Sequence, residues 1–308
     1  MARYAAIDVG TNTVLLLVAE ATPTGFRPVA ERGAITRLGQ GVDASHRLAP
    51  EAMARTLEAV GHFVDEAREL GVSGLAVSAT SAARDAENGA EFLAAARARA
   101  GVEVEILSGE EEARLSYLAV SNDFATEAGE RELVALDIGG GSTEFIFGRG
   151  STVGFHTSIN IGSVRLTERC VRSDPPSEED FARLQAALGP ALAAVPRPDA
   201  GALVVGVAGT VTTLYAVAHS IAPYVAARVH GGWLSREGLA KTRERLAATP
   251  LAERRSIPGL QPERADVIVA GAILLESALD HLGANGARVS DRGLRWGLLA
   301  ARFGGAHA

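Results

Sequence analysis

The chain contains very little cysteine, few aromatic residues and no long apolar run. Cys170 is the single cysteine among 308 residues, and aromatic side chains make up 5% of the total. One cysteine excludes an internal disulfide framework and a thiolate-rich metal site, and it is typical of a reducing compartment. The longest apolar run, residues 267–275, is interrupted by Gly271 and is too short to cross a bilayer. Because no signal-peptide pattern follows Met1, we expect a cytoplasmic protein with no membrane partner.

An excess of positive charge is also missing, as are the common nucleotide-binding motifs. The formal net charge is −7, so the chain has no general basic surface and we expect no nucleic-acid partner. The sequence contains no G-x-G-x-x-G fingerprint, and no Gly-Lys-Ser/Thr follows a glycine cluster, which argues against a dinucleotide site and a Walker loop. A site for a polyanion must therefore gather its positive groups locally.

One short phrase, by contrast, is present twice. Residues 7–13 and 136–143 each run from an apolar strand into Asp-x-Gly and a turn rich in hydroxyl groups, and each then resumes as a strand. The tip of such a hairpin presents backbone N–H groups and hydroxyls that suit a phosphate. Asp8 and Asp137 lie 129 positions apart. The repeat predicts two related lobes that grip one phosphorylated ligand between them.

The order of the predicted strands and helices supports two α/β lobes. The first reads as a three-stranded meander followed by alternating helices and strands, and the same order begins again at about residue 132. The polar stretch 121–131 is the best candidate for the boundary between them. We therefore expect an N-terminal lobe over residues 1–120 and a C-terminal lobe over residues 121–296.

The turn at residues 137–143 is the strongest chemical signal. Its three consecutive glycines allow close approach of the backbone to a ligand. Asp137 and Glu144 flank the turn, and carboxylates beside a phosphate loop suit Mg²⁺, which prefers oxygen ligands. The alternative is a hairpin whose glycines only permit a tight turn. The matching turn at residues 8–13 favours the functional interpretation.

Two further elements have both a structural and a functional interpretation. Gly209 and Thr210 open a helix after a buried strand, where free N–H groups favour an anion, although Thr210 can also be an ordinary helix N-cap. Ser108 and Glu111 form a capping box, which gives the acidic run 110–112 a structural role. The functional interpretation requires one of these glutamates to take a proton from water. Arg84 and Arg264 are candidate forks for phosphate oxygens.

These phrases together resemble the exopolyphosphatase/guanosine pentaphosphate phosphatase (Ppx/GppA) family, within the actin–hexokinase–sugar kinase superfamily. The resemblance runs in order through nearly the whole chain. The motifs that carry it are residues 7–13, 78–84, 108–114, 137–144, 208–213, 228–231, 264–268 and 290–295. One departure is Trp296, which stands where family chains usually have a glutamate.

The resemblance implies a fold, a reaction and a set of site residues. The fold is α/β, with two ribonuclease-H-like (actin/hexokinase-type) lobes around a central cleft and a C-terminal helix at about 297–308 that returns to the first lobe. The implied reaction is Mg²⁺-dependent hydrolysis of a terminal phosphate, with Glu112 as general base. The metal-binding residues are Asp137, Glu144 and Asp8. The phosphate-binding residues are Thr11, Asn12, Arg84, Gly140, Gly141, Ser142, Thr143, Gly209, Thr210 and Arg264.

The resemblance favours inorganic polyphosphate as substrate and implies a homodimer, since family members are often dimers. Guanosine pentaphosphate, converted to the tetraphosphate, is the alternative substrate. A sugar or acetate kinase of the same superfamily is a rival enzyme, although no acceptor site is recognisable in the sequence. A rival from another class is a non-catalytic sensor that binds guanosine penta- or tetraphosphate. The presence of Glu112, Asp137 and Glu144 weighs against the sensor.

Overall fold

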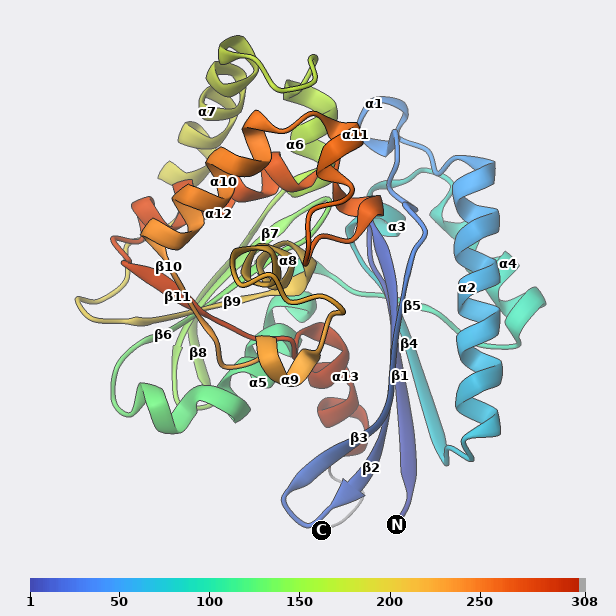
Figure 1. Cartoon of the computed structure of the whole chain (residues 1–308). Coiled ribbons are helices and arrows are strands. Elements are labelled where there is room, and N and C mark those ends of the chain that lie inside the picture. The colour runs from blue at the N-terminus through green and yellow to red at the C-terminus, as the bar shows by residue number, and fades with distance from the viewer. Residues whose placement is uncertain (305–308) are drawn as a thin grey trace. The chain divides into compact units, whose positions relative to one another are not determined.

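A computed structural model describes residues 1–304, and its chain divides into two compact units (Figure 1). Unit 1 comprises Met1–Ala119 and the segment from Gly293 onward, and unit 2 comprises Val120–Arg292. The last residues of the expected C-terminal helix, 305–308, lie outside the described residues. Within residues 1–304 no helix is both long enough and apolar enough to span a membrane.

Unit 1 is built on a five-stranded sheet in the order β3-β2-β1-β4-β5. Its strands are β1 (Arg3–Val9), β2 (Thr13–Thr22), β3 (Gly25–Ile35), β4 (Gly74–Ala79) and β5 (Glu105–Ile106). Its helices are α1 (Val42–Ser45), α2 (Pro50–Glu69), α3 (Ser81–Asp85), α4 (Gly89–Ala100), α13 (Leu294–Phe303) and the first part of α5 (Gly109–Ala128). β1 pairs antiparallel with β2 and parallel with β4, so a meander passes into a parallel sheet.

Strand alternation separates the two faces of the unit 1 sheet. Ile7 and Val9 of β1 join the core beneath α2 and α4, whereas Ala6 faces the opposite side. That opposite side is covered by α13 (Figure 1). Trp296 and Leu298 of α13 pack with Ala6. Trp296 is thus a core residue, which explains why an apolar side chain is suited to a position where a glutamate was expected.

Unit 2 repeats this plan with one added edge strand, in the order β10-β11-β9-β6-β7-β8. Its strands are β6 (Leu133–Ile138), β7 (Thr143–Arg149), β8 (Thr152–Ile159), β9 (Leu203–Val207), β10 (Trp233–Ser235) and β11 (Gly286–Val289). Its helices are α6 (Ser163–Cys170), α7 (Glu178–Ala193), α8 (Ala208–Ala218), α9 (Ala226–Val229), α10 (Arg236–Ala248), α11 (Leu251–Arg254), the 3-10 helix η1 (Pro262–Arg264) and α12 (Ile268–His281). A meander followed by parallel strands in both units is the ribonuclease-H-like arrangement, which confirms the predicted fold class.

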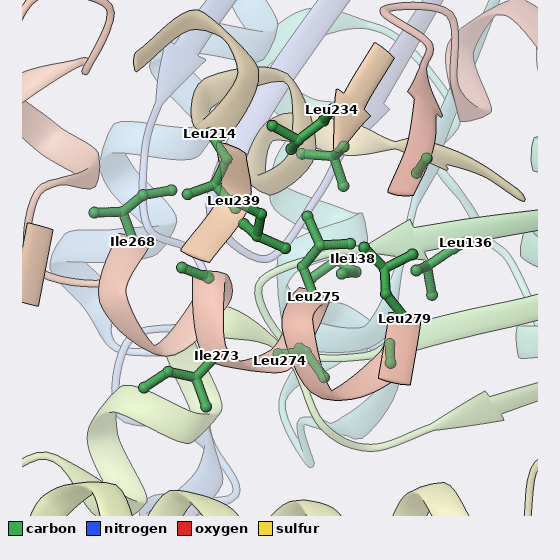
Figure 2. Packing of buried hydrophobic residues seen from close by; sticks show 14 of the residues in the cluster. Leu136, Ile138, Leu214, Leu234, Leu239, Ile268, Ile273, Leu274, Leu275 and Leu279 are labelled. Atoms are coloured by element: carbon green, nitrogen blue, oxygen red, sulfur yellow. The ribbon is translucent and has the colours of Figure 1, made fainter. Parts of the chain in front are cut away.

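The core of unit 2 lies between this sheet and the helices that cover one face of it. Leu136 and Ile138 of β6 pack with Leu275 and Leu279 of α12, which is buried along almost its whole length (Figure 2). Helix α12 is apolar nearly all round, as expected for a helix enclosed by other elements. Asp137 alternates with Leu136 and Ile138 and therefore points to the opposite face of the sheet.

Residues 121–131, where we expected the boundary between the lobes, are helical for most of their length. α5 continues to Ala128 without a break, and the boundary between the units falls inside this helix. Ser121, Phe124 and Ala128 are buried at helical spacing, while the intervening polar residues are mostly exposed. The polar composition of the stretch therefore reflects the solvent-exposed side of an amphipathic helix and not a loop.

Candidate functional site

The glycine-rich hairpin of unit 2 holds two of the predicted metal ligands opposite each other. Asp137 on β6 and Glu144 on β7 are direct partners in the antiparallel pair, so their side chains emerge on one face. Both are buried, at 8% and 1% exposure, and the Ser158 hydroxyl donates to Glu144 Oε1 at 2.7 Å. Two carboxylates buried side by side need a cation or donor groups to offset their charge.

Helix α6 fixes the direction of three peptides in this turn, through the carbonyls of Gly139, Gly140 and Gly141. The backbone N–H of Ser163 donates to the Gly139 carbonyl at 3.0 Å, and those of Val164 and Arg165 donate to the Gly140 carbonyl at 2.9 and 3.1 Å. The Nε of Arg165 donates to the Gly141 carbonyl at 2.9 Å.

The N–H groups of the same peptides point the other way. In a trans peptide the C=O and the following N–H point in opposite directions. The N–H groups of Gly140, Gly141 and Ser142 therefore face away from α6 and form one row of donors. A row of this kind is an anion-binding arrangement.

The hydroxyl groups of this hairpin differ in their surroundings. Thr143 Oγ1 donates to the Ile161 carbonyl at 2.6 Å, so its proton holds the segment that leads into α6. In this structure that hydroxyl cannot donate to a phosphate, so the predicted phosphate-binding role of Thr143 cannot depend on its hydroxyl proton. Ser142, also predicted to bind phosphate, is buried at the end of the turn.

The start of α8 brings three more predicted residues together. The Arg264 guanidinium lies against Gly209, where an added Cβ would come within 2.5 Å of Arg264 Cζ. Burial lowers the pKa of Arg264 to about 10, which leaves it cationic at neutral pH. Thr210 is not the helix N-cap, because α8 begins at Ala208 and the side chain of Thr210 packs against Gly271. The structure therefore places a cation beside the N-terminal turn of α8.

The hairpin of unit 1 is held through two of its carbonyls and carries a buried side-chain amide donor. The Asn12 carbonyl accepts from the N–H groups of Thr36 and Arg37 at 3.1 and 3.0 Å, and the Thr11 carbonyl accepts from Gly39 at 2.8 Å. Thr11 Oγ1 shares a 2.8 Å hydrogen bond with Ser81 Oγ. The Asn12 Nδ2 is buried and has no hydrogen-bond partner within residues 1–304. A buried donor without an acceptor is costly, so this amide is suited to a ligand oxygen.

The three consecutive glutamates at the start of α5 have three different environments. Glu111 Oε2 accepts from the Ser108 N–H at 3.2 Å and the Glu111 N–H donates to Ser108 Oγ at 3.2 Å, which confirms the predicted capping box. Glu110 is exposed, whereas Glu112 is 7% exposed. Arg84 Nη1 donates to Glu112 Oε2 at 3.0 Å and to the Leu107 carbonyl at 2.9 Å. Arg84 thus holds Glu112 in place, a contact that the phosphate-fork prediction did not include.

The oxygen donors of unit 2 fit a magnesium ion. Mg²⁺ is commonly held by one or two carboxylates, with waters and substrate phosphates completing its shell. The buried Asp137–Glu144 pair supplies two such carboxylates. Asp8, the third predicted ligand, belongs to unit 1, and Leu15 stands opposite it on β2. Among the residues that the structure describes, no group of three or more acidic, histidine or cysteine side chains is arranged to hold a metal.

Sequence reasoning missed the residues that support the glycine turn. Gly162 lies so close to the turn that a Cβ there would come within 2.6 Å of the Gly141 nitrogen. Arg165, three residues later, is the side chain that holds the Gly141 carbonyl. The sequence offered only a glycine just before the helical residues Ser163–Cys170 as a signal. This local pattern does not indicate contact with a turn about 20 residues earlier in the chain.

The fold and these turns define a ribonuclease-H-like protein of two units, each with a glycine-containing hairpin turn that follows an aspartate. The chain matches the Ppx/GppA phosphatase family over residues 17–303. It therefore belongs to that family, and it is a phosphatase, an enzyme of the hydrolase class.

Relatives and solved structures agree with this assignment. Exopolyphosphatase 2 of Mycobacterium tuberculosis is 38% identical over 295 residues, which span 92% of this chain and 91% of the relative. Exopolyphosphatase 1 of Mycobacterium bovis is 32% identical and covers 96% of this chain and 87% of its own length. An exopolyphosphatase from Cytophaga hutchinsonii superposes with a TM-score of 0.88 at 28% identity, over 98% of both chains. The Aquifex aeolicus Ppx/GppA family member gives a TM-score of 0.83 at 33% identity, over 100% of this chain and 99% of that one.

Proposed function

We propose that this phosphatase is an exopolyphosphatase, which hydrolyses the terminal phosphoanhydride bond of inorganic polyphosphate in a Mg²⁺-dependent reaction. Water supplies its oxygen to the terminal phosphorus, the bridging P–O bond breaks, and orthophosphate and a shortened chain result. The observation that carries the proposal is the buried Asp137–Glu144 pair beside the row of turn N–H groups. The names of the similar mycobacterial proteins support polyphosphate as the substrate.

Phosphate binding is assigned to donors in both units. In unit 2 the N–H groups of Gly140, Gly141 and Ser142 would hold phosphate oxygens, with Gly209, Thr210 and the Arg264 cation nearby at the start of α8. In unit 1 the buried Asn12 amide and the Thr11 hydroxyl are suited to the same task. Donors fixed before substrate binds stabilise a phosphoryl transition state without reorganisation at the moment of reaction.

Magnesium would be held by Asp137 and Glu144, with Asp8 as a proposed third ligand. When bound, it supplies positive charge that offsets the charge on the transferring phosphoryl group. The Ser158 hydroxyl orients Glu144 through its 2.7 Å hydrogen bond. The protein's own contribution is thus a pair of carboxylates held on one face of a sheet.

Glu112 is the proposed general base. Its carboxylate would accept the proton of the attacking water, and its hydrogen bond to Arg84 fixes its orientation. A carboxylate that is buried and oriented by Arg84 is better placed for this role than exposed Glu110 or the cap residue Glu111. The family resemblance also supports guanosine pentaphosphate as the alternative substrate and a homodimeric state, both of which stay predictions.

The test is phosphate release in the presence of Mg²⁺ from short polyphosphate, long polyphosphate and guanosine pentaphosphate, measured in parallel. We expect the fastest release from polyphosphate, almost complete loss with Glu112→Gln, and near-normal release with the matched control Glu110→Gln. Faster release from guanosine pentaphosphate would reassign the substrate. Binding without release from any of the three would identify a sensor, and transfer to an acceptor instead of water would identify a kinase.

A further inference from the structure

A pocket in unit 2 lies at the opposite end of α8 from the phosphate-binding turn. It has a volume of about 290 Å³ and is formed by the C-terminal end of α8, strand β10 and the first turns of α10. Because α8 has 11 residues, its two ends are about 16 Å apart. Leu234 of β10 closes the pocket on its inner side, where it packs with Leu214 and Leu239 (Figure 2). None of the residues proposed for hydrolysis lines this pocket.

The charge of the pocket is opposite to that of the chain. Its described lining includes His219, Lys241 and Arg245 and no carboxylate, although the chain has seven more acidic than basic residues. Lys241 and Arg245 lie one turn apart on α10, so they share one side of the helix. Lys241 pairs with Glu237 at 2.6 Å in a highly exposed ion pair, which contributes little and exchanges readily for a bound anion. The pocket is therefore suited to an anion.

Aromatic rings give the same pocket a surface for a planar group. Trp233 is 43% exposed, in a chain that has only two tryptophans. The Arg288 guanidinium lies over the Trp233 ring at 5.7 Å and restrains it. His219 stands beside Tyr215 with ring centroids 4.2 Å apart. An exposed, restrained indole at the mouth of a basic pocket is a stacking surface.

We propose that this pocket binds a nucleoside monophosphate. The base stacks on Trp233 near His219, and the phosphate is held by Lys241 and Arg245. A volume of about 290 Å³ is near the lower end of the range for small-molecule sites, which suits a ligand of the size of one nucleotide. The pocket does not depend on the proposed substrate, since it shares no residue with the hydrolytic site.

The fluorescence of Trp233 provides a direct binding measurement. The second tryptophan, Trp296, is buried in unit 1, so Trp296→Phe leaves Trp233 as the only reporter. We expect AMP and GMP to quench this emission saturably, and adenosine alone or inorganic phosphate alone to bind at least about tenfold more weakly. Lys241→Gln with Arg245→Gln should raise the dissociation constant by about tenfold or more, since charge-assisted contacts are lost.

Two control variants separate this pocket from general charge effects and from the hydrolytic site. Arg255→Gln removes an exposed cation of unit 2 outside the pocket and should leave nucleotide binding unchanged. Asp137→Asn should also leave it unchanged, while the Lys241/Arg245 double variant should release phosphate from polyphosphate at the normal rate. The proposal is overturned if no saturable quenching occurs, or if the double variant binds as well as its parent. It is equally overturned if Asp137→Asn abolishes binding, since the nucleotide then occupies the hydrolytic site.

Discussion

The hairpins of the two units share one backbone plan and differ in the chemistry they carry. Gly10 N–H donates to the Thr13 carbonyl at 3.0 Å, and Gly139 N–H donates to the Ser142 carbonyl at 3.1 Å, at corresponding positions of the repeat. An aspartate precedes each turn, yet Leu15 stands opposite Asp8 where Glu144 stands opposite Asp137. The comparison teaches that the duplication preserved the turn and left the second carboxylate in one copy.

The two turns are also supported by different elements. In unit 1, backbone N–H groups of the turn at residues 36–39 donate to two carbonyls of the hairpin. In unit 2, α6 and the Arg165 side chain donate to three. Unit 1 instead carries the proposed base, Glu112, on α5, which packs against the sheet of unit 1. We infer a division of labour in which unit 2 holds the metal and the phosphate row, and unit 1 supplies the base.

The largest expected effect comes from removing the base of unit 1. Glu112→Gln keeps the shape and the hydrogen bond from Arg84 but cannot accept a proton, so we expect kcat to fall by about 100- to 10,000-fold. Polyphosphate binding, measured by calorimetry, should survive. A kcat within a factor of about two of the parent value would show that Glu112 is not the general base. It would also contradict the inference that unit 1 supplies the base.

A smaller loss of kcat is expected when a methyl group is added to the glycine that packs against each turn. Gly162→Ala meets the backbone of Gly140 and Gly141, which cannot yield without moving the row of N–H groups, and kcat should fall on the order of 100-fold. Gly39→Ala meets the Thr11 side chain and Ala82 Cβ at 3.2 Å. Because a side chain can shift more readily than backbone, we expect a loss of only about tenfold.

Gly154→Ala is the matched control for the glycine pair. It lies on β8 with its nearest neighbour, the Phe147 carbonyl, at an ordinary 3.7 Å. Steady-state phosphate release and thermal unfolding should be measured on all three variants. Equal losses in Gly162→Ala and Gly39→Ala, with unchanged unfolding, would show that the two turns are equivalent and contradict the division of labour.

Arg165 provides a finer test of the unit 2 turn. Arg165→Gln removes the bond to the Gly141 carbonyl and frees the peptide that carries the Ser142 N–H. We expect KM for polyphosphate to rise by about three- to tenfold with a smaller change in kcat, and partial recovery with Arg165→Lys. Unchanged KM and kcat would mean that the turn holds its direction without this side chain.

The smallest effect on turnover is expected at a purely structural carboxylate of unit 2. Asp180 caps α7, where burial works to raise its pKa but hydrogen bonds from Ser173, Ser177 and Arg172 outweigh burial and lower it. A lowered folded pKa means that the carboxylate stabilises the fold above its unfolded pKa of about 3.9 and loses this contribution as pH falls. Asp180→Asn should lower the free energy of unfolding by about 1–3 kcal/mol at pH 7.

The control for Asp180→Asn is its rate of phosphate release, which should not change although the stability of the fold does. Urea unfolding should show a smaller difference between the parent and the variant at pH 3 than at pH 7, because the unfolded-state carboxylate is mostly protonated at pH 3. The difference should not vanish at pH 3, because the lowered pKa keeps the folded carboxylate ionised there, and phosphate release at pH 7 should stay unchanged. A fall in kcat as large as that of Gly162→Ala would show that loss of stability alone lowers activity. The kcat losses of the two glycine variants could then not be assigned to the geometry of the turns.

Local sequence signals were enough for the strands, the turns and one cap. Alternation in β1 and β6, the Asp-x-Gly turns and the Ser108–Glu111 box all depend on neighbours within a few residues. The repetition of these signals in the same order predicted two α/β lobes, and the family resemblance implied the ribonuclease-H-like fold. The two-unit plan was thus predictable because patterns within a few residues determine the strands and turns of each unit.

Contacts between distant segments were not predictable from the same signals. The bond from Arg165 to Gly141 and the close approach of Gly162 depend on where α6 packs. Thr210 met the local rule for an N-cap, yet the helix begins two residues earlier and its side chain is used in packing. The structure distinguishes the three consecutive glutamates 110–112 by their burial and by the contact of Arg84 with Glu112. The sequence alone did not contain this information.

The central claim is that the unit 2 hairpin holds the metal. The most direct test is the Mg²⁺ concentration that gives half-maximal phosphate release from polyphosphate, measured for the parent, Glu144→Gln and Asp8→Asn. Loss of one carboxylate of the opposed pair should raise this concentration by about 10- to 100-fold, and loss of Asp8, which has no carboxylate opposite it, should raise it by less than about fivefold. An equal or larger shift for Asp8→Asn would contradict the claim.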